Sequence, residues 1–161
     1  MRQEIILSQK EIPYRIQLSP DEQDDMCQGK HARLLEILRA SGFEVRPIVY
    51  DFRWSEQPWL PEDLRPLIEE DEEQHVFLEV LQDSIWLALD ATLDSTLESV
   101  LLAKSNCQIF TPSRVYSPEE SLLILESDQK AECDWQTNSK FYAGLNSWFE
   151  QLRGHNIACD A

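Results

Sequence analysis

Two apolar runs near the middle of the chain constrain its fold more than any other feature. HVFLEVL spans residues 75–81 and IWLALDA spans residues 85–91, and only Gln82, Asp83 and Ser84 lie between them. Runs rich in β-branched and aromatic residues that are joined by so short a connection form an antiparallel hairpin. The sequence therefore predicts a hairpin here and, with it, an antiparallel sheet.

The register of this hairpin decides how closely His75 approaches Asp90. Opposed residues in a hairpin have numbers with a constant sum. A turn at Gln82–Asp83 places His75 directly opposite Asp90, with Cβ atoms ~4.5–5.5 Å apart. A turn at Asp83–Ser84 makes the two residues diagonal neighbours, ~7–8 Å apart. Both registers remain open, and both put the imidazole and the carboxylate on one face of the sheet.

The segment 27–40 carries the clearest helical pattern of the chain. Its apolar positions recur at the spacing of one helix face, which His31 shares: Leu34, Leu35 and Leu38. Cys27 falls in the first turn, where unpaired N–H groups and a partial positive charge stabilise a thiolate. A reactive thiol and a buried structural cysteine are the two interpretations of this position.

Weaker patterns assign the rest of the chain. Residues 55–74 are polar and rich in proline and acid, which indicates a surface excursion between two strands. The other segments are predicted strands at 2–7, 12–18 and 43–54, predicted helices at 95–104 and 139–153, and short apolar runs at 108–116 and 121–126. Together they predict a single α+β domain over residues 1–161.

The charge of the chain restricts its partners. The 161 residues include 30 acidic and 14 basic residues, giving a formal net charge of −16. Nucleic acids and anionic membranes both require a cationic surface, so we expect neither as a partner. No run reaches the ~20 apolar residues of a membrane span. The first residues lack a secretory signal pattern, so we expect a cytoplasmic location.

The cysteines exclude several kinds of site. Cys27, Cys107, Cys133 and Cys159 form no CxxC pair, so the sequence predicts neither a zinc site nor a dithiol redox motif. Four scattered cysteines in a chain of this length do not indicate a disulfide framework. We therefore expect no metal or cofactor. One thiol acting with a distant histidine remains possible.

Two segments of the sequence, which together carry three motifs, resemble the transglutaminase-like superfamily of thiol enzymes. CQGKHARLLEILRASGFEVR (27–46) is similar to the family's nucleophile helix, which ends in Leu-Arg-Ala-x-Gly. HVFLEVLQDSIWLALDAT (75–92) resembles its His-aromatic-x-Glu-Val strand followed by Trp-x-x-x-Asp-x-Thr. More narrowly, EIPYRI (11–16), CQGK (27–30), FRWS (52–55) and the His-x-x-Leu-Glu-Val and Asp-Ala-Thr blocks look like those of small, stand-alone bacterial members. It departs from relatives at His31, where alanine is common, and in the long interval between Cys27 and His75, for which the stretch 55–74 accounts.

The resemblance implies a papain-like α+β fold with the nucleophile helix packed on an antiparallel sheet. It also implies that Cys27 is the nucleophile, His75 the base and Asp90 the acid that orients it. We expect acyl transfer or hydrolysis of a protein, peptide or other amide through a thioester. The Cys27 backbone N–H is one oxyanion donor, and Trp54 or Gln23 is the candidate second donor.

Two other functions stay open at this point. Transglutaminase-like domains without activity exist, so the chain is alternatively a protein-binding module on the same fold. A second alternative is an acidic protein that binds a basic partner through residues 61–74. A reactive Cys27 distinguishes the first of these from an enzyme, and strong salt dependence of binding supports the second.

Overall fold

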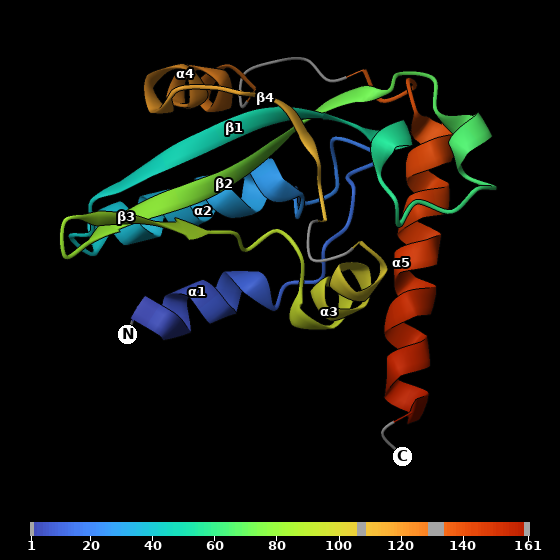
Figure 1. Ribbon diagram of the computed structural model, residues 1–161, viewed down its shortest axis with the longest axis horizontal. Helices are drawn as coiled ribbons and strands as arrows, with labels where there is room; N and C mark the ends of the chain where they lie inside the picture. Colours follow the sequence, from blue (N-terminus) through green and yellow to red (C-terminus); the bar gives the residue numbers. More distant parts are fainter. Residues whose placement is uncertain (1, 106–108, 129–133, 160–161) are drawn as a thin grey trace.

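The computed structural model of this chain describes residues 2–105, 109–128 and 134–159 (Figure 1). Four strands form one sheet of order β3-β2-β1-β4, and every neighbouring pair is antiparallel. The strands are β1 (Val45–Arg53), β2 (Glu72–Gln82), β3 (Ile85–Leu89) and β4 (Pro112–Val115). The α-helices are α1 (Arg2–Lys10), α2 (Cys27–Ala40), α3 (Ser95–Lys104), α4 (Pro118–Asp128) and α5 (Ser139–Cys159). Short 3₁₀ turns η1 (Trp54–Glu56) and η2 (Arg65–Leu67) follow β1.

The central hairpin is confirmed, with the turn at Asp83–Ser84. Gln82 pairs with Ile85, so His75 and Asp90 are diagonal neighbours rather than directly opposite. Asp83 and Ser84 both have positive φ, 51° and 64°. Two left-handed residues in a two-residue loop give the twist that flanking strands require. This turn therefore selects the second of the two predicted registers.

Helix α2 begins and ends where its pattern predicts. Leu34 and Leu38 are fully buried, and they share a core cluster with residues of β1, β2, β3 and α4: Val45, Leu78, Val80, Leu89 and Leu125. The amphipathic face of α2 is thus held against the sheet, which fixes the position of its first turn.

A second, aromatic cluster lies around α5 and α3, toward the other end of the sheet (Figure 1). The excursion 55–74 contributes Trp59, Leu60 and Leu64 to it, all less than 10% exposed. The prediction of a surface excursion is therefore wrong for these apolar side chains. They pack with Phe141 and Phe149 of α5.

The predicted N-terminal strands are wrong. Residues 2–10 form α1, whose Ile5 and Ile6 are half-buried against the α2 cluster. Residues 12–18 join no sheet and make one isolated bridge, Arg15 to Asp25. Their backbone groups bond to side chains instead, including those of Asp94 and Asn146. Alternating apolar residues can be buried in this way without a partner strand.

The two short apolar runs become β4 and α4. The predicted helix at 95–104 is confirmed as α3. The predicted helix at 139–153 is confirmed as part of α5, but its predicted end is wrong, because α5 continues through Gly154 to Cys159. Cys107, Cys133 and residue 108 lie outside the described residues. The structure thus confirms a mixed α+β protein built on an antiparallel sheet.

Candidate functional site

Cys27 lies beside the first half of strand β2. Among the described strands, none pairs with this half of β2 on the side away from β1. Strand β3 pairs with β2 only from Leu78 to Gln82, so the earlier residues of β2 are uncovered on that side. The first turn of α2 lies beside this part of β2, where Cys27 packs with Val49 of β1 and Val76 of β2. Cys27 Sγ is 3.8 Å from the carbonyl oxygen of Gln74, and the residue is 5% exposed. The thiol is therefore held beside the residue that precedes His75.

His75 and Asp90 form the closest polar pair of the site. His75 Nε2 lies 2.7 Å from Asp90 Oδ2, although the two residues are diagonal in the hairpin. The chain leaves β3 at Leu89, so Asp90 is free to turn toward β2. Since Nε2 is engaged by the carboxylate, Nδ1 is the imidazole nitrogen left for the thiol. The Cys27 thiol interacts with this same ring.

Two aromatic rings surround His75 and remove it from water. The Tyr50 ring centroid is 5.0 Å from the imidazole centroid, and the Phe110 centroid is 4.8 Å from it. His75 is 1% exposed. Tyr50 is the residue paired with His75 across β1 and β2, so sheet register brings this ring to the site.

Burial and charge act in opposite directions on His75. Burial alone lowers the pKa of the imidazole, but the charge and hydrogen bond of Asp90, with a contribution from Cys27, raise that pKa to about 10. The same pairing holds the pKa of Asp90 well below its ordinary value, against the effect of burial. The Asp90 side chain is 45% exposed, so solvent screens part of this interaction. At neutral pH His75 is therefore an imidazolium paired with a carboxylate.

Asp90 is held by the turn of chain that follows it. Its Oδ1 accepts from the Thr92 N–H at 2.9 Å and lies 3.7 Å from His31 Nε2. His31 is fully buried, and burial lowers the pKa of its imidazole to about 4. His31 is therefore neutral at neutral pH, unlike His75.

Trp54 and Gln23, the two candidates for the second oxyanion donor, differ in whether they reach the thiol. Trp54 is 3% exposed and lines a cavity of about 20 Å³ together with Cys27 and His75. Its Nε1 interacts with the Tyr142 side chain, although it makes no hydrogen bond of good geometry. Gln23 is exposed and donates to Asp25 Oδ1 at 2.7 Å. The structure thus brings Trp54, but not Gln23, to the cavity at the thiol.

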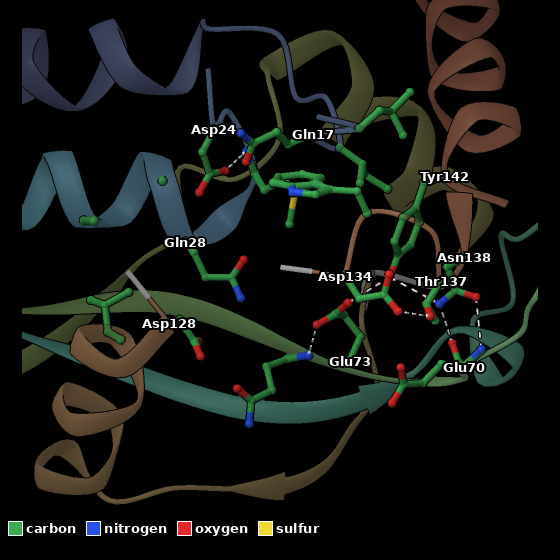
Figure 2. A pocket seen from close by; sticks show the side chains of 18 of the residues that line it. Gln17, Asp24, Gln28, Glu70, Glu73, Asp128, Asp134, Thr137, Asn138 and Tyr142 are labelled. Atoms are coloured by element: carbon green, nitrogen blue, oxygen red, sulfur yellow. Dashed lines mark hydrogen bonds between the residues drawn. The ribbon is translucent and has the colours of Figure 1, made fainter. Parts of the chain in front are cut away.

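A much larger cleft of about 640 Å³ adjoins this small cavity (Figure 2). The two share lining residues, including Met26, Glu73 and Tyr142. Among the charged residues of the described lining, Arg33 is the one cation, and we call this pocket the acidic cleft. Its carboxylates are Asp24, Glu36, Glu70, Glu72, Glu73, Asp128 and Asp134. Its volume is in the range of small-molecule sites.

The end of the acidic excursion forms part of this cleft, as Glu70 and Glu73 illustrate (Figure 2). Tyr142 of α5 donates to Glu73 Oε2 at 2.9 Å, and burial raises the pKa of this carboxyl. Asn138 caps the excursion by accepting from the Glu69 and Glu70 N–H groups. These contacts fix the acidic side of the cleft against α5.

Sequence reasoning missed Gln28, Tyr50, Phe110 and Tyr142. The position of Gln28 next to Cys27 was a signal, and its Oε1 is 3.8 Å from the thiol. Tyr50 follows from the register of β1 on β2, but a long excursion separates those strands. No local pattern marks Phe110 or Tyr142, which reach the site through tertiary packing.

Neither a metal site nor a membrane span is found in the described part of the chain. No group of three or more potential ligands among the described residues is arranged to hold a metal ion. Within the same residues, no helix has the length and apolar character needed to cross a bilayer.

Comparisons with known proteins do not assign this chain to a family, so the site is described from its geometry alone. No family model, curated protein or solved structure gives a significant match to the chain. The fold and site define a mixed α+β protein with a buried thiol beside a histidine–aspartate pair.

Proposed function

We propose that the protein catalyses thiol-dependent acyl chemistry on an amide or peptide carbonyl, with Cys27 as nucleophile, His75 as proton donor and acceptor, and Asp90 as the group that orients His75. The observation that carries this proposal is the buried His75 imidazole, which pairs with the half-exposed Asp90 carboxylate beside the Cys27 thiol. A thiol, a base and an acid that orients the base are the parts that nucleophilic acyl transfer needs. The resemblance of 27–46 and 75–92 to transglutaminase-like enzymes, with their papain-like core, agrees with it.

The proposed reaction has two steps. The Cys27 thiolate attacks the carbonyl carbon, and imidazolium Nδ1 gives its proton to the leaving amine as the C–N bond breaks. A thioester on Cys27 results. Water then attacks this thioester with His75 as base, which gives hydrolysis, or an amine attacks it, which gives transfer.

Two donors are proposed for the oxyanion. Cys27 is the first residue of α2, so its backbone N–H has no acceptor within the helix. Trp54 supports the second role, because its buried indole N–H lines the cavity at the thiol and makes no hydrogen bond of good geometry, its neighbour there being Tyr142.

The acidic cleft supports a substrate or acceptor amine without negative charge, which we take to be part of a protein, peptide or other amide. Nucleic acid is disfavoured as a partner by the same carboxylates. We also propose a cytoplasmic location, where a thiol nucleophile stays reduced.

An inactive binding module remains the second candidate. The acidic cleft supports it, since a cationic peptide segment fits there with or without chemistry at Cys27. In that case residues 70–74 would bind the partner from the wall of the cleft. These residues belong to the segment 61–74, for which binding to a basic partner is one of the alternatives raised by the sequence.

The test uses p-nitrophenyl acetate as an activated acyl donor and intact-mass and peptide mapping as readouts. We expect a burst of nitrophenolate of about one per chain, followed by slow turnover, and an acetyl group on Cys27. Cys27→Ala should abolish both. His75→Ala should slow the burst by roughly 10²-fold or more, since general acid–base catalysis is worth 10²–10⁴-fold.

A control variant in the hairpin turn, Asp83→Asn, should leave the burst unchanged, because Asp83 is exposed and lies at the far end of the hairpin. Acetylation spread evenly over several cysteines, or a burst that survives Cys27→Ala, would rule out the proposed nucleophile. The binding module would then be the better interpretation.

A further inference from the structure

Two neighbouring residues of α2 hold the short turn that carries Asp90, residues 90–92. His31 Nε2 accepts a hydrogen bond of 2.9 Å from the Ala91 N–H. Lys30 Nζ donates to the Thr92 carbonyl at 2.8 Å and to the Ile12 carbonyl. Both side chains are 0% exposed. The turn is thus fastened to the nucleophile helix by buried polar contacts on each side.

The partners of His31 determine which of its nitrogens carries the proton. Ala91 N–H is a donor, so Nε2 must be the unprotonated acceptor. Nδ1 lies 2.8 Å from the Cys27 carbonyl, an acceptor only, so Nδ1 must carry the hydrogen. His31 therefore links the backbone of the nucleophile residue to the backbone beside Asp90, as a neutral imidazole of one defined tautomer.

This link has a direct consequence for the Asp90 carboxylate. Asp90 Oδ1 bonds to the Thr92 N–H within the same turn, and Oδ2 bonds to His75. The carboxylate is 45% exposed and diagonal to His75, so nothing in the hairpin pairing alone fixes its direction. The direction is fixed by the turn, and the turn by Lys30 and His31.

We propose that His31 is a positioning residue, which holds residues 90–92 so that the Asp90 carboxylate orients the His75 imidazole toward Cys27. Lys30 holds the same turn through its hydrogen bond to the Thr92 carbonyl. This inference rests on the proposed function for its catalytic meaning, but its structural claim concerns the His75–Asp90 pair and is measurable without substrate. The competing role for His31 is packing of the leucine face of α2.

The first measurement is the tautomer of His31 in the full chain, by ¹⁵N NMR of histidine-labelled protein at pH 7. We expect the Nδ1–H form for His31 and a doubly protonated ring for His75. The Nε2–H form of His31 would overturn the proposal outright, because Ala91 would then have no acceptor there. This measurement requires no variant to fold.

The second measurement compares His31→Gln, whose terminal oxygen keeps an acceptor near the position of Nε2, with His31→Phe, which keeps volume without an acceptor. We expect His31→Phe to lower the titration midpoint of His75 by about one pH unit or more, and His31→Gln to keep it near the wild-type value. The alkylation rate of Cys27 should fall in the same order. Leu38→Val, a packing change on the same helix, should leave the midpoint unchanged.

The outcomes separate this proposal from the proposed function. A His75 midpoint that is the same in wild type and His31→Phe would reduce His31 to packing and contradict the proposal. A His75 midpoint that falls in His31→Phe but not in His31→Gln would show that His31 positions Asp90. If Cys27 never acylates in the same protein, the positioning role stands and the proposed catalytic function is refuted.

Discussion

At the scale of single residues, the charge of His75 depends on one neighbour. Burial lowers the pKa of this imidazole, and Asp90 is the main group that raises it. We predict that Asp90→Asn removes the positive charge of His75 at neutral pH, with a titration midpoint below the ordinary ~6.5 of histidine. Histidine ¹⁵N NMR across pH 5–10 measures it. Asp83→Asn is the control, and an imidazole still protonated above pH 8 in Asp90→Asn would contradict the account.

The pKa of His31 is shifted in the opposite direction to that of His75, and this shift makes the unfolding free energy depend on pH. Its folded pKa of about 4 is below the ~6.5 of an unfolded histidine, so the unfolded chain takes up a proton first as pH falls. The neutral imidazole thus contributes stability above about pH 6.5, and this contribution is lost as pH falls toward 4. Asp90, His75, Lys30 and Cys27 are the charged or titratable groups around it.

The corresponding variant is His31→Gln, which cannot titrate. Between pH 7 and pH 5 we predict that wild type loses about 1–2 kcal/mol more unfolding free energy than His31→Gln does, as measured by urea denaturation. Equal losses in both proteins would show that His31 does not stay neutral in the folded state.

The sequence predicted the residues that chemistry requires but not their surroundings. Cys27, His75 and Asp90 were identified from helix position, hairpin arithmetic and resemblance, and the structure places these three together. Tyr50, Phe110 and Tyr142 were not predicted, since their approach depends on how β1 pairs with β2 and how α5 packs. Gln23 was expected near the thiol, but its amide is taken by Asp25.

At the scale of elements, the start of α2 depends on one glycine. A Cβ on Gly29 would lie 2.2 Å from the Asp24 carbonyl oxygen, because the preceding loop crosses the first turn at close range. We predict that Gly29→Ala lowers the unfolding free energy by about 1–3 kcal/mol and slows alkylation of Cys27, since the turn that carries the thiol must shift.

Gly154→Ala is the matched control, because a Cβ there meets open space in helix α5. It should change nothing at Cys27 and raise stability by about 0.5–1 kcal/mol through helix propensity. Urea denaturation and alkylation of both variants check this pair. A Gly29→Ala protein as stable and as reactive as Gly154→Ala would contradict the close approach.

Elements with a strong period were predicted well, and those held by tertiary contacts were not. Helix α2 has the predicted bounds because its leucines follow one face. Residues 2–7 were predicted as a strand from β-branched content, yet Ile5 and Ile6 pack as part of α1 against α2. Residues 12–18 alternate like a strand, but their backbone bonds go to Asp94 and Asn146, far along the chain.

At the scale of the whole molecule, part of the net charge of −16 lies beside the site, since carboxylates line the cleft next to Cys27. We predict that a trimethylammonium-bearing methanethiosulfonate modifies Cys27 on the order of tenfold faster than a sulfonate-bearing one at low salt. The ratio should fall toward one at high salt and decrease in Asp24→Asn and Asp128→Asn. Equal rates at low salt would show that the acidic cleft is not the route to the thiol.

The central claim is that Cys27, His75 and Asp90 act as one unit, and the most direct test is the alkylation rate of Cys27 by iodoacetamide near neutral pH. Peptide mapping reports each cysteine separately, in wild type, His75→Ala and Asp90→Asn. We predict that Cys27 is the fastest of the four cysteines and that both variants slow it by roughly tenfold or more. A Cys27 that is inert, or that reacts at the same rate without His75, would contradict it.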